Sequence, residues 1–236
     1  MSADVAFLAL RLEGPLQSWG FESQFSRRNS GLWPTKSGIL GMCCAAMGVA
    51  RGSERERELL ARSVDTRLLV VALPRIIKFG KTGRRLLTTR RITDYHTVQG
   101  TMRASGGKPK DTHLTWRQYL CDSAFGAVLS GDRSLVDELR GDTGRDGIEN
   151  PKWGLWLGRK ACIPTAPVFA GVENTREAAL TRLIGDRDLN ALSYMEEVEE
   201  FGEGVDSLPD QPLCFATPDG LRQFTLRRVR LHEARK

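Results

Sequence analysis

The chain has few of the residues from which metal centres and disulfide frameworks are built. It contains three histidines and five cysteines among 236 residues, with no Cys-x-x-Cys or His-x-x-x-His spacing. The cysteines are odd in number, and four lie inside apolar stretches, which predicts reduced, buried thiols. The sequence therefore predicts neither a metal site nor a cofactor.

Long apolar runs and common catalytic arrangements are missing as well. No apolar run approaches the ~20 residues that cross a bilayer. The first residues, MSADVAFLALRLEG, lack the basic start of a signal peptide. We therefore expect a cytoplasmic protein that makes no membrane contact. No Ser-His-Asp spacing, paired-carboxylate motif or cofactor fingerprint appears, so no familiar class of enzyme is indicated.

Charge is distributed unevenly along the chain, whose net charge is +6. Residues 75–117 hold eleven Lys or Arg against two Asp, and residues 222–236 carry a further net +5. Residues 173–210, by contrast, carry a net −8. Clustered cations mark either a solvated surface or a polyanion footprint. Because the 75–117 segment also contains Tyr95 and Trp116, we favour nucleic acid as its partner.

Apolar periodicity and capping residues predict an alternation of strands and helices. Strands are expected at the apolar runs 5–12, 68–73, 118–130, 153–162, 213–216 and 223–231. Helices are expected behind polar caps at 35–50, 53–63, 135–140 and 174–183. The order in the first two-thirds matches the split βαβ plan. We therefore predict an α+β, ferredoxin-like (RRM-like) body.

A long β-hairpin arm is predicted to protrude from this body. Its centre, RASGGKPK, is typical of a flexible tip, and its flanks are compatible with strands. An arm with so little apolar surface is expected to pack on a partner. The expected division is a ferredoxin-like domain over 1–171, with the arm at about 80–117, and a small C-terminal β extension over 172–236 packed on the same body.

The segment from Gly14 to Gly41 combines four aromatic and three basic residues with several glycines. Aromatic faces suit bases, cations suit phosphates, and glycine permits close approach of backbone. Where the segment meets the predicted helix, free amides together with Lys36 and two hydroxyls would form a phosphate seat. Plain helix capping explains the same residues equally well.

Two further stretches carry charge near residues that suit RNA. Residues 157–160, LGRK, place two cations directly after a glycine, although solvated basic residues at a strand end are as common. His96 shares a strand face with Asp94, so a general base for metal-free RNA cleavage is conceivable there. An ordinary polar pair on an arm is the interpretation that we favour.

Taken together, these stretches resemble one family. GPLQSWG followed by PTKSGILGMCCAAMG is similar to the N-terminal signature of the CRISPR-associated repeat-associated RNA-binding (RAMP) superfamily. RITDYHTVQG, TWRQYLCDSAF and WLGRKACIPTAPVF resemble, more narrowly, the CasD family, the fifth-type subunits of type I-E Cascade. The likeness runs in order from about Phe7 to Gly171, and the final third is less distinctive.

The resemblance implies a body with a projecting thumb that holds the 5′ handle of the crRNA and caps the Cascade backbone in antiviral defence. It implies contacts with the backbone subunit CasC and the large subunit CasA, and with target DNA only indirectly. It implies no nuclease activity, because another subunit cuts the precursor RNA in this subtype. A metal-independent endoribonuclease that processes repeat RNA is the alternative, and a structural wedge that binds only protein is a third.

We therefore expect RNA contacts, and no catalytic residues, at four places in the chain. The expected contacts are Gln17, Trp19, Arg27 and Arg28 along the handle path; Thr35, Lys36, Ser37 and Gly38 at the helix start; Arg159 and Lys160 after the last body strand; and Arg90, Arg91, Tyr95, His96 and Arg103 on the thumb.

Overall fold

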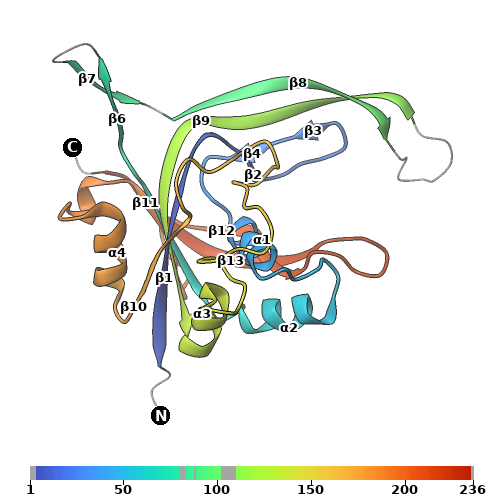
Figure 1. The fold of residues 1–236 in the computed structure, drawn as a ribbon. Coiled ribbons are helices and arrows are strands. Elements are labelled where there is room, and N and C mark those ends of the chain that lie inside the picture. Colours follow the sequence, from blue (N-terminus) through green and yellow to red (C-terminus); the bar gives the residue numbers. More distant parts are fainter. Residues whose placement is uncertain (1–3, 80–82, 88, 102–109, 235–236) are drawn as a thin grey trace.

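A large, mostly antiparallel sheet with helices on both faces organises the chain (Figure 1). The computed structural model describes residues 4–79, 83–87, 89–101 and 110–234. The main strands are β1 (Val5–Gln17), β5 (Arg67–Ala72), β8 (Arg90–Thr101), β9 (Lys110–Asp132), β10 (Phe169–Glu173), β11 (Tyr194–Glu197), β12 (Val205–Cys214) and β13 (Gln223–His232). The helices are α1 (Lys36–Ala46), α2 (Glu54–Arg62), α3 (Arg133–Arg140) and α4 (Arg176–Ile184), with a 3-10 turn, η1, at Leu189–Ala191. This confirms the expected α+β class.

The strand order across the sheet is β10-β1-β9-β5-β11-β13-β12, and each neighbouring pair is antiparallel. Helices α1 and α2 lie in the connection from β1 to β5, and α3 lies in the connection from β9 to β10. Strands β11, β12 and β13, from the final third of the chain, extend the same sheet beyond β5.

Both faces of the central strands are buried, which explains why they appear in the sequence as near-continuous apolar runs. Leu8 and Leu10 of β1 belong to a core cluster that includes residues of α1, α2 and α3. Ala9 of β1 and Val71 of β5 belong to a second cluster, with residues of α4. Figure 1 shows α4 on one side of the sheet and the other three helices on the opposite side. None of the helices in the described part of the chain has the length and apolarity of a bilayer-spanning segment.

The predicted arm exists as the β8–β9 hairpin, and it is continuous with the core (Figure 1). Its pairing runs from Arg90 opposite Cys121 to Thr101 opposite Lys110, and the tip at 102–109 lies outside the described residues. The same strand β9 then enters the sheet between β1 and β5. The arm strand and the core strand expected at 118–130 are therefore one element.

The prediction placed the start of the arm too early in the chain. Two strands, β6 (Arg75–Phe79) and β7 (Gly83–Leu87), pair with each other in a separate two-stranded sheet. Only β8 pairs with β9 in the arm itself. The residues 80–82 and 88, which the prediction also assigned to the arm, lie outside the described part of the chain.

The strand predicted at 153–162 is wrong, since this stretch is a loop and the fourth body strand is β10. Apolar side chains of this loop pack into the core, where Leu157 and Cys162 are fully buried. The Leu157 amide donates to the Cys162 carbonyl at 2.7 Å, and the Ser18 amide donates to the Leu157 carbonyl at 3.0 Å. At Gly158 the backbone has φ of 98° and a Cβ would lie 1.8 Å from the Ser18 carbonyl oxygen, so only glycine fits.

Helices α2, α3 and α4 match their predicted ranges closely, because the residues that cap them are their immediate neighbours in sequence. Ser53 accepts from the Glu56 amide at the start of α2, and Asp132 accepts from the amides at the start of α3. Helix α1 ends earlier than the predicted residue 50, since Gly48 adopts φ of 66° after it. The short strand β11 was not predicted, because its two glutamates lie in the segment 173–210, whose net charge is −8 and which has no long apolar run there.

Candidate nucleic-acid interface

The loop that follows β1 is docked along the β9 edge of the arm, on the side that faces the body. Its strand β3 (Arg27–Arg28) pairs in parallel with β9, so that Arg27 lies opposite Trp116 and Arg28 opposite Arg117. The Trp116 amide donates to the Ser26 carbonyl at 2.9 Å. Figure 1 shows β3 beside the arm, with β2 (Trp19–Gly20) and β4 (Ser30–Gly31) next to it. Two segments far apart in sequence thus form one surface.

Five arginines surround this junction on its two faces, and we call them together the arginine surface. Arg27 and Arg91 lie on the face that carries Trp116, Arg28 and Arg117 lie on the other, and Arg159 reaches the Arg28 carbonyl. Where their side chains form hydrogen bonds, the acceptors are neutral oxygens. Arg159 donates to the carbonyls of Arg28 at 2.7 Å and Gln118 at 3.2 Å, and Arg91 donates to the Ser30 carbonyl at 3.4 Å.

No carboxylate in the described part of the chain forms an ion pair with any member of the arginine surface. Elsewhere in the protein, arginines such as Arg133, Arg140 and Arg182 have a carboxylate oxygen 2.6 to 2.7 Å away. Uncompensated clustered cations raise the local concentration of anions and contact phosphates. The arginine surface is therefore the best match in the described residues to a polyanion.

Three other cations were predicted to contact RNA. Two of them lie at the margin of this surface, and the third lies outside the described residues. Arg90 is exposed and lies 3.8 Å from the Asp122 carboxylate. Lys160 is exposed, with its ammonium 5.8 Å from the centre of the Trp156 ring. Arg103 lies outside the described residues. Lys160 forms no ion pair among the described residues, whereas the charge of Arg90 is partly compensated by Asp122.

The two faces of the arm differ in chemistry. Tyr95 and Trp116 are opposite each other on one face, with ring centroids 5.4 Å apart. His96 lies on the other face, opposite Thr115 and diagonal to His113. Its ring nitrogen Nδ1 is buried and has no hydrogen-bond partner among the described residues. Tyr95 and His96, neighbours in sequence, therefore face different environments.

Gln17 and Trp19 lie inside the protein rather than along a ligand path. Gln17 is 0 % exposed, and its amide nitrogen donates to the carbonyls of Leu12 at 2.9 Å and Ser123 at 2.8 Å. Its amide oxygen accepts from the Trp19 indole at 2.9 Å. These bonds fix where the loop leaves β1, and they leave no side-chain surface for the stacking contact expected of Trp19.

The start of α1 is capped by groups of the protein itself. This agrees with plain helix capping, the alternative to a phosphate seat. The Lys36 amide donates to the Asp210 carboxylate at 2.9 Å, and Thr35 accepts from the Gly38 amide at 3.2 Å. A Cβ at Gly38 would lie 2.9 Å from the Trp19 ring. An anion from the protein itself thus occupies the place predicted for phosphate, and of the four residues only Ser37 and Gly38 stay partly exposed.

The Lys36 side chain is the centre of a buried charge network instead of a phosphate contact. Its ammonium is 0 % exposed, 3.1 Å from Glu197 and 2.5 Å from the Thr66 carbonyl oxygen. Burial lowers the pKa of Lys36, and Glu197 opposes that shift. Arg227, also buried, donates to Asp210 at 3.0 Å and approaches Glu197 at 3.9 Å. Part of the acidic segment therefore neutralises two buried cations.

Arg51 and Arg222, which were not among the predicted site residues, extend the basic area toward the C-terminal hairpin. Burial lowers the pKa of Arg222, and the nearby charges of Arg51 and Arg28 lower it further. Arg222 follows a turn that is closed by the Thr217 amide donating to the Leu221 carbonyl at 2.8 Å. The only sequence signal was the net positive charge of residues 222–236.

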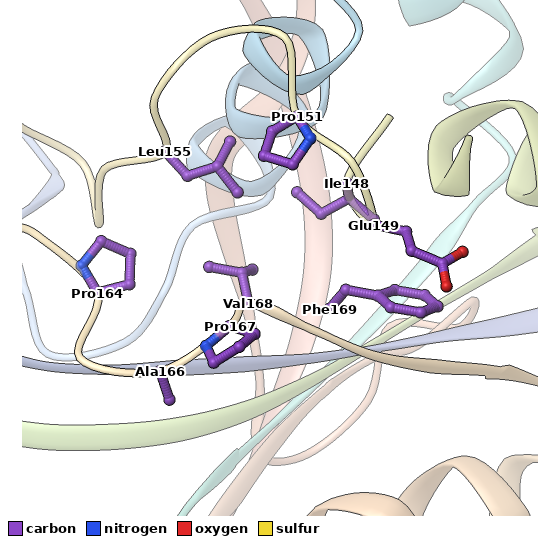
Figure 2. A pocket seen from close by; sticks show the side chains of 9 residues that line it. All are labelled: Ile148, Glu149, Pro151, Leu155, Pro164, Ala166, Pro167, Val168 and Phe169. Carbon is purple, nitrogen blue, oxygen red and sulfur yellow. The ribbon is translucent and has the colours of Figure 1, made fainter. Parts of the chain in front are cut away.

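Figure 2 shows a cavity of about 310 Å³ whose lining is unsuited to a polyanion. Its only charged lining residue is Glu149, which pairs with Arg140 at 2.7 Å. The lining consists of Ile148, Glu149, Pro151, Leu155, Pro164, Ala166, Pro167, Val168 and Phe169. Among the residues that the structure describes, no group of three or more His, Cys, Asp or Glu is arranged to hold a metal ion.

Comparisons with known proteins agree on one family. A family model described as CRISPR-associated protein (Cas_Cas5) matches residues 7–230. The chain is 34% identical over 170 residues to the CRISPR system Cascade subunit CasD of Escherichia coli (strain K12), covering 70% of each protein.

Solved structures agree with the sequence matches. A chain of a structure titled CRISPR RNA-guided surveillance complex aligns with a TM-score of 0.66 and 26% identity, over 95% of this chain and 88% of that chain. A second, titled Crystal structure of Cas protein, aligns with a TM-score of 0.61 and 27% identity, over 98% of this chain and 95% of that one. The chain therefore belongs to the Cas5 family of CRISPR-associated proteins.

Proposed function

We propose that the chain is a non-catalytic crRNA-binding subunit of a type I-E CRISPR Cascade complex, in which it holds the 5′ handle and caps one end of the backbone. Its similarity to the Cascade subunit CasD and to a chain of an RNA-guided surveillance complex supports this role. The observation that carries the RNA-binding part is the arginine surface, because five cations without carboxylate partners converge where the arm meets the loop after β1.

The proposed body is ferredoxin-like, with the β8–β9 hairpin as its thumb. The order β10-β1-β9-β5, antiparallel throughout, supports a split βαβ plan. Helix α4 covers one face of these strands, the face on which an RRM would present its stacking aromatics. In this protein the proposed RNA path therefore runs along the arm and its docked loop rather than over the sheet.

Along this path the arginine surface contacts phosphates, and Arg90, Lys160 and Ser37 contribute from its rim. Gln17, Trp19 and Lys36 act from beneath, by fixing the loop and the start of α1. Thr35 and Gly38 have the same supporting role through the helix cap. Handle sequence is read from the edges of unpaired bases, since phosphate contacts carry no sequence information.

The proposed protein partners are the backbone subunit CasC, packed on the thumb, and the large subunit CasA nearby, with target DNA reached only through the assembled complex. The arm supports this arrangement because Ile92 and Leu114 are 46 % and 38 % exposed, and it leaves the sheet to reach beyond the body. The proposed location is the cytoplasm. A variant that lacks residues 94–117 of the arm tests the structural alternative: if the complex still assembles, assembly does not depend on the thumb as a wedge.

The salt dependence of RNA binding tests the central proposal. The chain is purified with its partner subunits, the ends of the bound RNA are sequenced, and affinity for that RNA is measured at several salt concentrations. Arg27→Ala combined with Arg28→Ala should lower the slope by about 1.4 log units per log unit of salt, because each phosphate contact on a single strand contributes about 0.7. Arg145→Ala combined with Arg187→Ala, two exposed arginines elsewhere, is the control. An unchanged slope in the first variant contradicts the proposal.

The endoribonuclease alternative has one observation in its favour: His96, His113 and Arg117 share the arm face opposite Tyr95. Two imidazoles and a cation could supply a general acid and base with electrostatic stabilisation. Purified protein is incubated with repeat RNA in EDTA to test this alternative. Site-specific cleavage that disappears in His96→Ala would replace the non-catalytic assignment, and intact RNA supports it.

A further inference from the structure

We infer that one face of the arm is a stacking shelf for unpaired nucleobases, formed by Tyr95 and Trp116 with Arg27 as the adjacent phosphate contact. The inference rests on the proposed RNA-binding function and adds to it the ligand class, unstacked bases of single-stranded RNA, and a specific place. Trp116 is the centre of this shelf, because Tyr95 lies opposite it on one side and Arg27 on the other.

The shelf is defined by strand register. Tyr95 lies directly opposite Trp116 in the antiparallel β8–β9 pair, and Arg27 lies opposite Trp116 in the parallel β3–β9 pair. Residues in register project to the same face of a sheet, so all three side chains belong to one face. Arg91, four residues before Tyr95 on β8, projects to that face as well.

The aromatic pair is exposed and held at a fixed angle. Tyr95 is 56 % exposed and Trp116 is 42 % exposed, with ring planes inclined by 58° at a centroid distance of 5.4 Å. Two large aromatic side chains exposed side by side present apolar surface that a planar ligand can cover. Tilted, partly open rings leave a face of each available, as base stacking on protein aromatics requires.

The backbone beside the shelf is strained. Phe25 has φ of 46° and is 87 % exposed, a conformation that bulky residues rarely adopt. Reciprocal hydrogen bonds between Gln24 and Arg27, at 3.0 and 2.8 Å, close the turn, and the Ser26 carbonyl anchors it to the Trp116 amide. Such strain persists where the surroundings impose it, and it clusters at binding sites. Here the turn fixes Arg27 next to the indole.

The charges around the shelf favour RNA over protein as its occupant. Arg27 and Arg91 on this face form no ion pair in the described part of the chain. Arg28 and Arg117 behind it form none either, although Asp94 lies opposite Arg117 in the β8–β9 pair. A protein occupant would need several carboxylates to match this field, whereas each nucleotide of RNA brings both a base for the rings and a phosphate for an arginine. Arginine and aromatic residues interleaved in this way are the components of single-strand sites.

The test compares two probes of equal charge, using the full chain purified with its partner subunits but with the native RNA removed. One probe is a fluorescent single-stranded RNA of about eight nucleotides, within the range that single-strand sites cover, and the other is its abasic counterpart. Trp116→Ala or Tyr95→Ala should weaken binding of the base-bearing probe by about 5- to 150-fold, as expected for loss of one stacked base. Binding of the abasic probe should be unchanged.

Three variants separate stacking from other effects. Trp116→Tyr should retain most of the affinity because it keeps a ring on the shelf. Arg27→Gln should weaken both probes because both contain phosphates. Trp153→Ala, a tryptophan of similar exposure (44 %) in the 151–168 loop, should change neither. The thermal midpoint of each variant shows whether the arm still folds.

The outcomes distinguish this inference from the function on which it rests. If wild-type protein binds both probes and Trp116→Ala leaves both affinities unchanged, the shelf is refuted while RNA binding stands. If Trp116→Ala loses partner subunits and keeps its RNA affinity, the shelf is a protein surface and the inference is again overturned. If wild-type protein binds neither probe, the proposed function itself fails and the shelf fails with it.

Discussion

Removing the Asp210 carboxylate should destabilise the protein far more than removing the Lys36 ammonium, although the two groups belong to one buried network. Asp210 accepts hydrogen bonds from Arg227 and from the Lys36 amide. In Asp210→Ala, the Arg227 side chain, 2 % exposed, keeps only a carboxylate 3.9 Å away, that of Glu197, which also serves Lys36. Leaving a buried charge unpaired costs about 3–5 kcal/mol.

The converse variant, Lys36→Met, removes a cation whose burial already opposes its charge. Glu197 still has Arg227 and Arg67 within 4 Å, at 3.9 and 3.8 Å, so no buried carboxylate is left without a cation. The variant loses the hydrogen bonds that the ammonium donates to the Thr66 carbonyl and to Glu197, for which about 1–3 kcal/mol is the expected range. Asp210→Ala should therefore be the more damaging of the two by about 2 kcal/mol.

Urea unfolding and thermal melting of the purified chain, both monitored by tryptophan fluorescence, measure the two losses of stability. For a domain of this size each kcal/mol shifts the melting temperature by about 2–4 °C, so Asp210→Ala should melt about 6–20 °C below the wild type. Asp210→Asn keeps an acceptor for the Lys36 amide and removes the charge. Its loss of stability should therefore lie between those of Asp210→Ala and Lys36→Met. If Lys36→Met proves as damaging as Asp210→Ala, the argument from unpaired buried charge is wrong.

Three further predictions follow from single residues. Because the folded-state pKa of Lys36 lies below its ordinary 10.5, the stability of wild type relative to Lys36→Met should rise as pH increases from the folded-state pKa toward 10.5, and a difference independent of pH in urea titrations would contradict this. A thiol reagent should label Cys121, the one partly exposed cysteine, before the four buried ones; burial raises the pKa of Cys44 to about 12, so early labelling there, seen by peptide mass mapping, would be inconsistent with the packing. Gly158→Ala should lower the melting temperature by several degrees, because its Cβ would overlap the Ser18 carbonyl at a left-handed φ; unaltered melting would show that the loop can move aside.

Local signals predicted the helices well because their determinants lie within a few residues. Ser53 and Asp132 cap the helices that follow them, and both caps are visible in sequence as polar residues ahead of an apolar period. The hairpin arm was also predictable, since basic, β-compatible flanks around a glycine-rich tip have no core to join.

Long-range partners explain what the sequence did not predict. The start of α1 looked like a phosphate seat because Asp210, which caps it, lies 174 residues further along the chain. The apolar 153–162 stretch looked like a strand because a buried loop and a buried strand need the same residues, and only Gly158 hinted at the difference. The pairing of Arg27 with Trp116 likewise depends on strand register that no local pattern encodes.

The unbroken course of β9 has a mechanical consequence. The strand spans 23 residues, from the far end of the arm to the middle of the sheet, and is flanked there by β1 and β5. Its one left-handed residue, Asp122, lies where the arm pairing stops, and its own carboxylate contacts Arg75 and Arg90. A force that a bound partner exerts on the outer end of the arm is therefore transmitted through one continuous backbone strand to the centre of the core. The arm should move together with the core sheet and not as a separate unit.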